Sequence, residues 1–391
     1  MPQKKRGQTP VEEAVARILN ALDVPEKTEE IPLLQALGRV AAGDVCARVA
    51  QPPFDRSALD GYALQAADIA AAGPETPVTL PVSRYLCAGS DPGGPLAPGT
   101  AARIMTGAPV PAGADCVLRQ EDTESDGQTV TFHAPVEARA NVCFAGEDIA
   151  PGKCLVPAGT RLDEVSLGLL AGQGVQTVTV YAKPRAALMP TGDELCSPET
   201  PLRPGKIYDS NGPLLAAGPD DPAALTGKLA RLLAEYPLVI TTGGVSVGDR
   251  DYLPQAAEEA GAKLLFYGID AKPGTPALAA GKDGHVLLCL SGNPFASFAT
   301  FELLARPALA KLQGADPAPV RVRAALANGF GKPSPLRRFV RATLMGGVVT
   351  LPKGGHFSGG IGALAGCNCL VDVPAGSRAL NAGDEVEVIL L

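Results

Sequence analysis

The sequence predicts a multidomain protein of the α/β plus β class: an interrupted helical N-terminal domain with a small inserted β domain, a three-layer α/β domain with a mostly parallel sheet, and a C-terminal β-barrel-like domain. The chain has 391 residues, whereas single hydrophobic cores stop growing at roughly 250–300 residues. Strand and helix patterns alternate in the middle of the chain. Short apolar runs between Gly, Pro and Asp turns lie on both sides of that region.

Residues 1–50 and 139–182 are predicted to form the discontinuous N-terminal domain, with residues 51–138 inserted as the β domain. A capping box at residues 9–12 and helical spacing of apolar residues up to Leu22 predict a helix over about 10–22. A second, short helical stretch is expected over about 34–40. After the inserted domain, "LDEVSLGLLAGQGV" predicts a helix with Asp163 as its N-cap.

Residues 183–314 show the pattern of an α/β domain. The segments "PRAALM", "PLVITT", "AKLLFYGI" and "HVLLCL" predict strands, while "LPQAAEEA" and residues 294–312 predict helices. Only one convincing helix, over about 222–235, is expected between residues 212 and 236. Residues 315–391 return to short strands in "VRVRAALA", "RFVRATLM", "CLVDVP" and "EVEVILL", which predict the C-terminal β domain.

Composition argues against several classes of function. The formal net charge is −7, and no basic stripe is present, which argues against nucleic-acid binding. No apolar run approaches the roughly 20 residues that span a bilayer, and the N-terminal basic cluster lacks the apolar core of a signal peptide. We therefore expect a cytoplasmic protein. The nine cysteines are scattered, which is typical of reduced thiols, and Cys367 and Cys369 are expected to be strand residues rather than metal ligands.

Three loops that follow predicted strands are candidates for a binding site, because ligands bind outside the carboxyl ends of parallel strands. These loops are "PTGDEL" (190–195), "TTGGVSVGD" (241–249) and "SGNP" (291–294). Glycines at 243, 244 and 248 would let backbone N–H groups face an anion, and Ser246 adds a hydroxyl. Asn293 is expected to cap the helix that begins at Pro294, with Gly292 before it. Each loop alone could equally be a simple turn; three on one edge favour an anion site.

Carboxylates occupy the same predicted edge, at Asp193, Glu194, Asp249 and Asp251, and "GKIYDSN" adds Asp209. Carboxylates would repel a phosphate unless a cation lay between them, and Mg²⁺ binds through one or two carboxylates together with phosphate oxygens. The edge therefore predicts a Mg²⁺–phosphate site, with a solvated acidic rim as the alternative. Lys272 in "AKPGTPALAAG" is suited to an oxyanion, although it could also be a surface residue in a turn.

Several motifs together resemble one family. They are "PPFDRSALDGYAL", "RIMTGAPVPAGADCVLRQEDT", "GEDI", "LMPTGDEL", "GKIYDSN", "TTGGVSVGDRDYL", "KPGTP" and "LSGNPFASFATFELLARPAL". They are long, they occur in the family's order, and they run from near residue 50 to near residue 310. The sequence resembles the molybdopterin molybdenumtransferase family, which includes the enzyme domain of gephyrin.

The resemblance implies an elongated four-domain homodimer that inserts molybdenum from molybdate into adenylylated molybdopterin and releases AMP, with Mg²⁺. Molybdopterin adenylyltransferase would be the upstream partner, and the site would lie between subunits. The implied catalytic residues are Asp60, Asp148, Glu194, Asp251 and Lys272, with Glu194 and Asp251 also positioning the metal. The implied substrate-binding residues are Thr106, Asp209, Gly243, Gly244, Ser246, Gly292, Asn293 and Pro294, with Arg341 and Ser358 as a second anion contact.

The sequence departs from the family pattern at several points. Thr275 stands where the family usually has a second lysine of the molybdate pocket, and Gly268 replaces another frequent lysine. Ser291 replaces a proline, Arg56 replaces an asparagine, and residues 212–236 are too short for the usual helix, strand and helix. These departures leave two alternatives open: a molybdopterin-binding or scaffolding homodimer impaired in catalysis, and a phosphate-ester hydrolase on a similar α/β domain.

Overall fold

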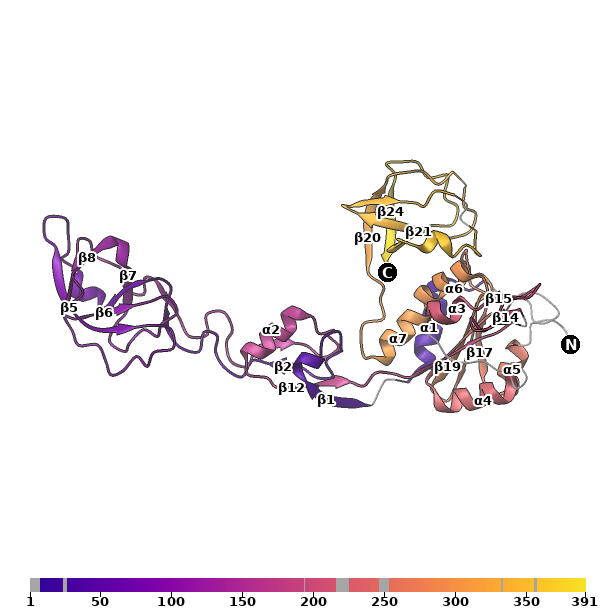
Figure 1. Cartoon of the computed structure of the whole chain (residues 1–391), viewed down its shortest axis with the longest axis horizontal. Helices are drawn as coiled ribbons and strands as arrows, with labels where there is room; N and C mark the ends of the chain where they lie inside the picture. The colour runs from indigo at the N-terminus through magenta and orange to yellow at the C-terminus, as the bar shows by residue number, and fades with distance from the viewer. Residues whose placement is uncertain are drawn as a thin grey trace. The chain divides into compact units, whose positions relative to one another are not determined.

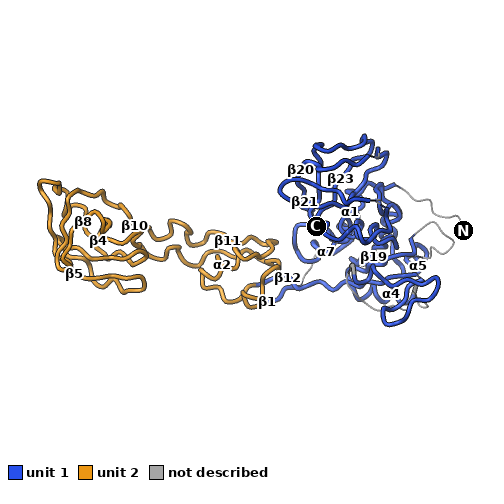
Figure 2. The backbone as a smooth tube through the Cα atoms, turned by 45° about the horizontal axis from the view of Figure 1, so that its top comes forward, with its two compact units in different colours: residues 1–30, 179–391 blue, residues 31–178 orange. Residues whose placement is uncertain are grey.

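The structure, a computed structural model, describes residues 8–23, 27–192, 194–215, 225–245, 253–331, 333–354 and 357–391. The chain forms two compact units (Figures 1 and 2): unit 1 contains residues 1–30 and 179–391, and unit 2 contains residues 31–178. The division falls within β1 (Thr28–Pro32) and β12 (Thr177–Tyr181), which pair with each other. The four domain boundaries expected from the sequence stay predictions.

Unit 1 contains a five-stranded sheet in the order β13-β16-β19-β18-β17. Its strands are β13 (Ala186–Pro190), β16 (Leu238–Thr242), β19 (His285–Leu290), β18 (Leu278–Lys282) and β17 (Lys263–Tyr267). The first three are parallel neighbours, and β18 is antiparallel to both β19 and β17. The mostly parallel sheet is confirmed. The antiparallel strand β18 is an addition, because its Ala- and Gly-rich sequence gives little strand signal.

Helices cover both faces of this sheet, as Figure 1 shows. On one face, α4 (Leu225–Glu235) and α5 (Leu253–Glu259) pack on Val239 and Leu287. On the other, α1 (Val11–Ala21), α6 (Pro294–Thr300) and α7 (Arg306–Leu312) pack on Ile240 and Leu288. Successive residues of a strand point to opposite faces, so the two cores share one sheet and the three-layer prediction is confirmed.

Helix α1 differs from the sequence prediction in its start and its packing. Its N-cap residue is Pro10, and no side chain caps it, so the predicted capping box is wrong. Thr9 instead pairs with the α/β domain through its backbone. Its amide donates to the carbonyl of Gly268 at 3.2 Å, and its carbonyl accepts from the amide of Asp270 at 2.8 Å. Val11, Ala14 and Ile18 are buried against the α/β core, although the predicted boundaries placed this helix with the N-terminal domain.

The predicted helix over 294–312 forms with one irregularity. A five-residue π-helical segment, Phe301–Ala305, joins α6 to α7. Pro307 lacks an N–H and cannot continue regular α-helical bonding, and a π turn absorbs such an interruption. Between residues 212 and 236, the described residues form α3 (Asn211–Leu215) and α4, without a strand. The predicted start of this last helix, residues 222–224, lies outside the described residues.

The C-terminal residues of unit 1 form a closed barrel in the order β20-β22-β21-β23-β24, which confirms the predicted barrel-like domain. Its strands are β20 (Arg321–Leu326), β22 (Val348–Thr350), β21 (Arg338–Met345), β23 (Cys369–Val373) and β24 (Glu385–Leu390). The short β22 was not predicted. Cys369 lies in β23 as expected, whereas Cys367 lies just before the strand and its amide donates to the carbonyl of Leu364.

Unit 2 contains a six-stranded sheet in the order β7-β4-β6-β5-β9-β8. The strands are β7 (Cys116–Arg119), β4 (Gly61–Leu64), β6 (Ala101–Ile104), β5 (Val78–Leu86), β9 (Thr129–Phe132) and β8 (Thr123–Ser125). Its two faces build separate cores, one around Tyr62 and Phe132 and one around Ala63 and Ile104. The predicted β domain is thereby confirmed.

The remaining part of unit 2 contains α2 (Glu164–Gly172) and two short strand pairs. These pairs are β2 (Val45–Cys46) with β11 (Cys154–Val156), and β3 (Arg56–Ser57) with β10 (Val142–Cys143). The side chain of Asp163 accepts from the amide of Ser166 and caps α2 as predicted. The helical stretch expected over 34–40 is only a 3₁₀ turn, Leu33–Gln35. Across the described residues, no helix is both long enough and apolar enough to cross a membrane.

Candidate active site

The three loops predicted from the sequence do lie on one edge of the sheet. In the parallel register, Pro190 of β13 pairs with Thr242 of β16, and Thr242 pairs with Leu290 of β19. All three strands therefore end at the same level. The amide of Thr191 donates to the carbonyl of Thr242 at 2.8 Å, and the amide of Gly243 donates to the carbonyl of Leu290 at 3.0 Å. Each bond joins the first residue after one strand to the last residue of the neighbouring strand.

Glycine is required where two of these loops touch. Gly243 has a φ of +88°, and a Cβ there would lie 2.4 Å from the carbonyl oxygen of Thr191. Gly292 of the third loop lies next to Gly243, since a Cβ at Gly292 would be in van der Waals contact with the Cα of Gly243, at 3.4 Å. The amide of Gly243 is already bonded to Leu290. Its role is therefore to form the turn, not to donate its N–H to a ligand.

The segment that follows β15 (Ile207–Tyr208) is hydrogen-bonded to this edge. Oδ1 of Asp209 accepts from the amides of Asn211 and Gly212, at 3.0 and 2.9 Å, at the start of α3. Nδ2 of Asn211 donates to the carbonyl of Gly292 at 2.8 Å. Oδ1 of the buried Asn211 has no hydrogen-bond partner among the described residues. Such an atom is unusual, and a ligand at this edge could satisfy it.

Of the two predicted metal ligands, the described residues include Glu194. Glu194 is exposed, and its carboxylate lies over Gly192, where a Cβ would be 2.7 Å from Oε1. The described residues contain no cluster of three or more His, Cys, Asp or Glu side chains that could hold a metal ion. Mg²⁺ needs only one or two carboxylates beside phosphate oxygens, which the exposed Glu194 fits. Asp193, Ser246, Gly248, Asp249 and Asp251 lie outside the described residues.

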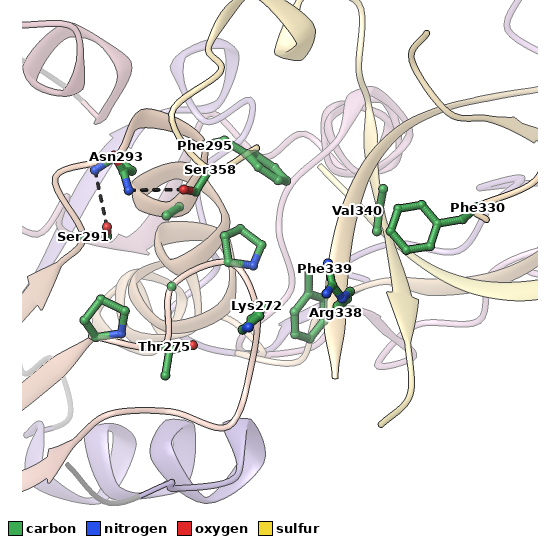
Figure 3. Close-up of a pocket in the computed structure, with 14 residues that line it drawn as sticks. Lys272, Thr275, Ser291, Asn293, Phe295, Phe330, Arg338, Phe339, Val340 and Ser358 are labelled. Carbon is green, nitrogen blue, oxygen red and sulfur yellow. Dashed lines mark hydrogen bonds between the residues drawn. The ribbon is translucent and has the colours of Figure 1, made fainter. Parts of the chain in front are cut away.

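A pocket of about 300 Å³ lies where the third loop meets the barrel (Figure 3). It is lined by residues 272–276 of the Lys272 loop, by Ser291, Asn293, Phe295 and Ala296, by Phe330, and by Arg338, Phe339, Val340 and Ser358 from the C-terminal domain. Ser291 and Asn293 thus belong both to the pocket and to the loop edge. The hydroxyl of Thr275 donates to the carbonyl of Ala271 at 2.7 Å, so this residue stabilises the Lys272 loop.

Asn293 joins the α/β domain to the C-terminal domain. It is the N-cap residue of α6, but its side chain does not cap the helix, contrary to the prediction. Its Nδ2 donates instead to Oγ of Ser358 at 3.2 Å (Figure 3). The amide of Phe295 donates to the carbonyl of Ser358 at 2.9 Å. Ser358 is therefore held at the start of α6, beside the pocket.

Arg341 lies behind the pocket and does not line it. Its side chain is completely buried, its Cζ lies 4.3 Å from the centroid of the Phe295 ring, and Nη1 donates to the carbonyl of Gly360 at 2.6 Å. Burial lowers the pKa of its guanidinium. Arg341 is therefore not an exposed residue of β21. Its environment suits a residue that positions the loop carrying Ser358.

Unit 2 holds the remaining candidates. Asp60, just before β4, accepts from the amide and the hydroxyl of Thr106, and these hydrogen bonds lower the pKa of its carboxyl group. Asp148 lines a second pocket of about 310 Å³ with residues 49–54, Arg56, Gly107, Glu147 and Gly172. The structure therefore brings Asp60 and Thr106 into direct contact. Asp148 lines a pocket that also includes Gly107, the residue after Thr106.

Two residues of unit 1 were missed by the sequence prediction. Asn211 stands inside the quoted motif "GKIYDSN", and its amide could have been recognised as a polar group at the strand edge. Arg338 belongs to the barrel strand β21 and lines the same pocket as Lys272. No sequence spacing connects positions 272 and 338, so its place depended on the tertiary fold.

The fold and this edge together define a multidomain protein whose central α/β domain carries a binding edge at the carboxyl ends of its parallel strands. Residues 187–311 match the family described as "probable molybdopterin binding domain". Residues 9–174 match "MoeA N-terminal region (domain I and II)", and residues 323–391 match "MoeA C-terminal region (domain IV)".

Relatives with known names agree with these matches over the whole chain. A molybdopterin molybdenumtransferase of Staphylococcus epidermidis is 36% identical over 408 residues, covering 100% of this chain and 97% of the relative. One from Staphylococcus aureus is 35% identical over 409 residues, with the same coverage. A crystal structure of the molybdopterin biosynthesis MoeA protein of Pyrococcus horikoshii has a TM-score of 0.85 and 30% identity, covering 98% of this chain and 100% of that chain. The chain belongs to the molybdopterin molybdenumtransferase family.

Proposed function

We propose that this protein inserts molybdenum from molybdate into adenylylated molybdopterin and releases AMP, as the final step of molybdenum cofactor biosynthesis. One observation carries the proposal: the loop edge of the parallel sheet runs directly into the Lys272 pocket, because Ser291 and Asn293 belong to both. A phosphate-bearing substrate at the edge and an oxyanion in the pocket would therefore be neighbours. The full-length match to named transferases supports the same reaction.

The residues would act mainly through positioning and electrostatics. The turn built by Gly243 and Gly292 would let phosphate oxygens approach the backbone closely, and Asn211 would offer its unpartnered Oδ1 to a donor of the substrate. Lys272 would hold molybdate while the substrate's dithiolene sulfurs bind molybdenum. No protein nucleophile is needed, because the substrate supplies these sulfur ligands.

The reaction is proposed to depend on Mg²⁺, with Glu194 as one ligand. When bound, the ion would neutralise phosphate charge. The second proposed ligand, Asp251, lies outside the described residues and is proposed from its place on the predicted edge and from the family resemblance. Glu194→Gln should abolish Mg²⁺-dependent turnover without unfolding the protein, because this side chain is exposed. Glu199→Gln, an exposed carboxylate on the same segment, is the matched control. Full turnover by the Glu194 variant would exclude it as a metal ligand.

The active protein is proposed to be a homodimer, with Asp60, Thr106 and Asp148 of one subunit completing the site of the other. Unit 2 exposes apolar side chains on neighbouring elements: Leu34 is 85% exposed, Leu37 52% and Val165 69%. A second copy of the chain could cover them. Light scattering should therefore give the mass of a dimer, and a monomer at micromolar concentration would refute this part of the proposal.

The direct test supplies adenylylated molybdopterin, Mg²⁺ and molybdate, and measures AMP release together with cofactor formation. A molybdopterin adenylyltransferase would provide the substrate, because the product of adenylylation is what this reaction consumes. Release of AMP that requires molybdate would support the transferase. Tight substrate binding without molybdate-dependent release would favour a binding or scaffolding homodimer instead. Cleavage of simple phosphate esters would favour a hydrolase.

A further inference from the structure

Lys272 and Arg338 are paired through their backbones although they come from different domains. The amide of Lys272 donates to the carbonyl of Arg337 at 2.9 Å, and the amide of Phe339 donates to the carbonyl of Lys272 at 2.8 Å. This pattern makes Lys272 and Arg338 the partners of a parallel β-bridge. Bridge partners lie side by side, about 5 Å apart, with their side chains on the same face.

Both side chains line the same pocket, and Figure 3 labels both of them there. The other described residues that line it are uncharged, and none of them is Asp or Glu. Two cations that lie side by side without a carboxylate between them repel each other. The pocket is therefore strongly electropositive and would gain most from an anion.

The neighbouring residue shows how unusual this arrangement is. Arg337 is bonded to the carboxylates of Asp372 and Glu12. Arg338, the next residue, forms no ion pair within the described part of the chain, and its buried Nε has no hydrogen-bond partner there. A buried guanidinium nitrogen without an acceptor is rarely left so unless a ligand satisfies it.

We propose that Arg338 binds molybdate as the second cation of the pocket, in a clamp with Lys272. This inference rests on the proposed function and identifies how this chain recognises the oxyanion. Molybdate carries two negative charges, which the two cations match. Lysine provides a compact charge and arginine provides several donors in one plane, so the two contact different oxygens. Ser291, Asn293 and Ser358 supply uncharged polar contacts around them.

The clamp also accounts for the threonine at position 275. Its hydroxyl is bonded to Ala271, so Thr275 contributes no charge where the family usually has a second lysine. Arg338 supplies that charge from the barrel strand β21, beside Lys272. The pocket should then select tetrahedral dianions: tungstate should compete with molybdate, whereas perchlorate, a tetrahedral monoanion, should not.

Titration calorimetry of the full chain with sodium molybdate tests the inference. Arg338→Gln should weaken binding by about 10-fold or more, the usual value of a hydrogen bond to a charged group, and Arg338→Lys should restore most of the affinity. Arg323→Gln is the matched control, since Arg323 is an exposed barrel arginine whose side chain is 74% accessible. Circular dichroism checks that each variant is folded.

Turnover separates this inference from the proposed function. If the function is right, Arg338→Gln should raise the KM for molybdate and leave kcat nearly unchanged. Molybdate binding that depends on Arg338, without any AMP release, would contradict the proposed transferase reaction but support the clamp. Unchanged molybdate affinity in folded Arg338→Gln, or equal competition by perchlorate, would overturn the clamp even if the protein releases AMP.

Discussion

Oδ1 of Asp60 accepts two hydrogen bonds from Thr106, one from the amide and one from the hydroxyl, each 2.7 Å long. Thr106 follows β6 and Asp60 precedes β4, and these two strands are antiparallel neighbours. The pair therefore fixes the carboxylate relative to the sheet of the inserted domain. Both hydrogen bonds lower the pKa of Asp60 below its ordinary value, and the one from the backbone amide has the larger effect.

Removing the Thr106 hydroxyl should raise the pKa of Asp60. Thr106→Val keeps the backbone donor and deletes the second one, so the pKa should move part of the way back toward 3.8. Any stability that this lowered pKa contributes is present above the unfolded value and is lost as pH falls through the folded one. Carbon-detected NMR titration measures the shift. Asp126 is the internal reference, because its exposed carboxylate accepts hydrogen bonds from Gln128 and Thr129 and is unaffected by the substitution. An unmoved Asp60 titration would show that the hydroxyl does not matter.

Adding a methyl group at Gly243 should damage the loop edge. Gly243→Ala forces a Cβ to 2.4 Å from the Thr191 carbonyl oxygen at a φ of +88°, a strain worth about 1–3 kcal/mol. We expect a lower melting temperature and weaker binding of adenylylated molybdopterin. Gly227→Ala in α4 is the control, because its Cβ would meet nothing within 4 Å; it should stabilise by about 0.5–1 kcal/mol. Equal effects at both positions would contradict the role of Gly243.

The parts of the fold that could be predicted are those that one segment specifies by itself. The β-branched and apolar residues of β16, Leu-Val-Ile-Thr-Thr, predict a buried strand, and the Asp163 cap predicts the start of α2. The parts that were missed depend on distant partners. Thr9 lies against Gly268 instead of capping its helix. The Ala- and Gly-rich β18 becomes a strand only between β17 and β19.

The same distinction applies to the site. The three loops were predicted because each directly follows a strand, and parallel strands end together. The pocket could not be predicted, because Lys272 and Ser358 meet only where the barrel packs on the α/β domain. Asp209 was predicted to contact substrate, yet its Oδ1 is occupied by two backbone amides.

Asp209 is therefore expected to act mainly by holding the start of α3. Asp209→Asn retains an acceptor oxygen and should keep both the melting temperature and the turnover. Asp209→Ala removes the acceptor, which should cost about 1 kcal/mol as for other helix caps, and it should also displace Asn211 from Gly292. Calorimetry and AMP release compare the two variants. A stable but inactive Asp209→Asn protein would show that the charge itself contacts substrate or metal.

Asp372 should be the carboxylate on which the C-terminal barrel depends most. Its side chain is only 6% exposed. Arg337 binds both of its oxygens through Nε and Nη2, at 2.8 and 2.6 Å, and Arg321 adds a third bond of 2.8 Å. Burial opposes ionisation, but the hydrogen bonds from Arg337 and Arg321 outweigh it and lower the pKa of Asp372. Asp372→Ala would leave these arginines without their carboxylate and should destabilise by about 3–5 kcal/mol.

The matched control is Glu385→Ala, which breaks the exposed 3.6 Å pair with Arg323 and should cost no more than about 1 kcal/mol. Calorimetry of the unfolding transition compares both variants with the unchanged protein. Because the pKa of Asp372 is lowered, its contribution is present above the ordinary value of 3.8 and is lost as pH falls through the folded value. The difference between the unchanged protein and Asp372→Ala should therefore shrink in acid. A difference that stays constant below pH 3.8 would assign the stability to packing instead of charge.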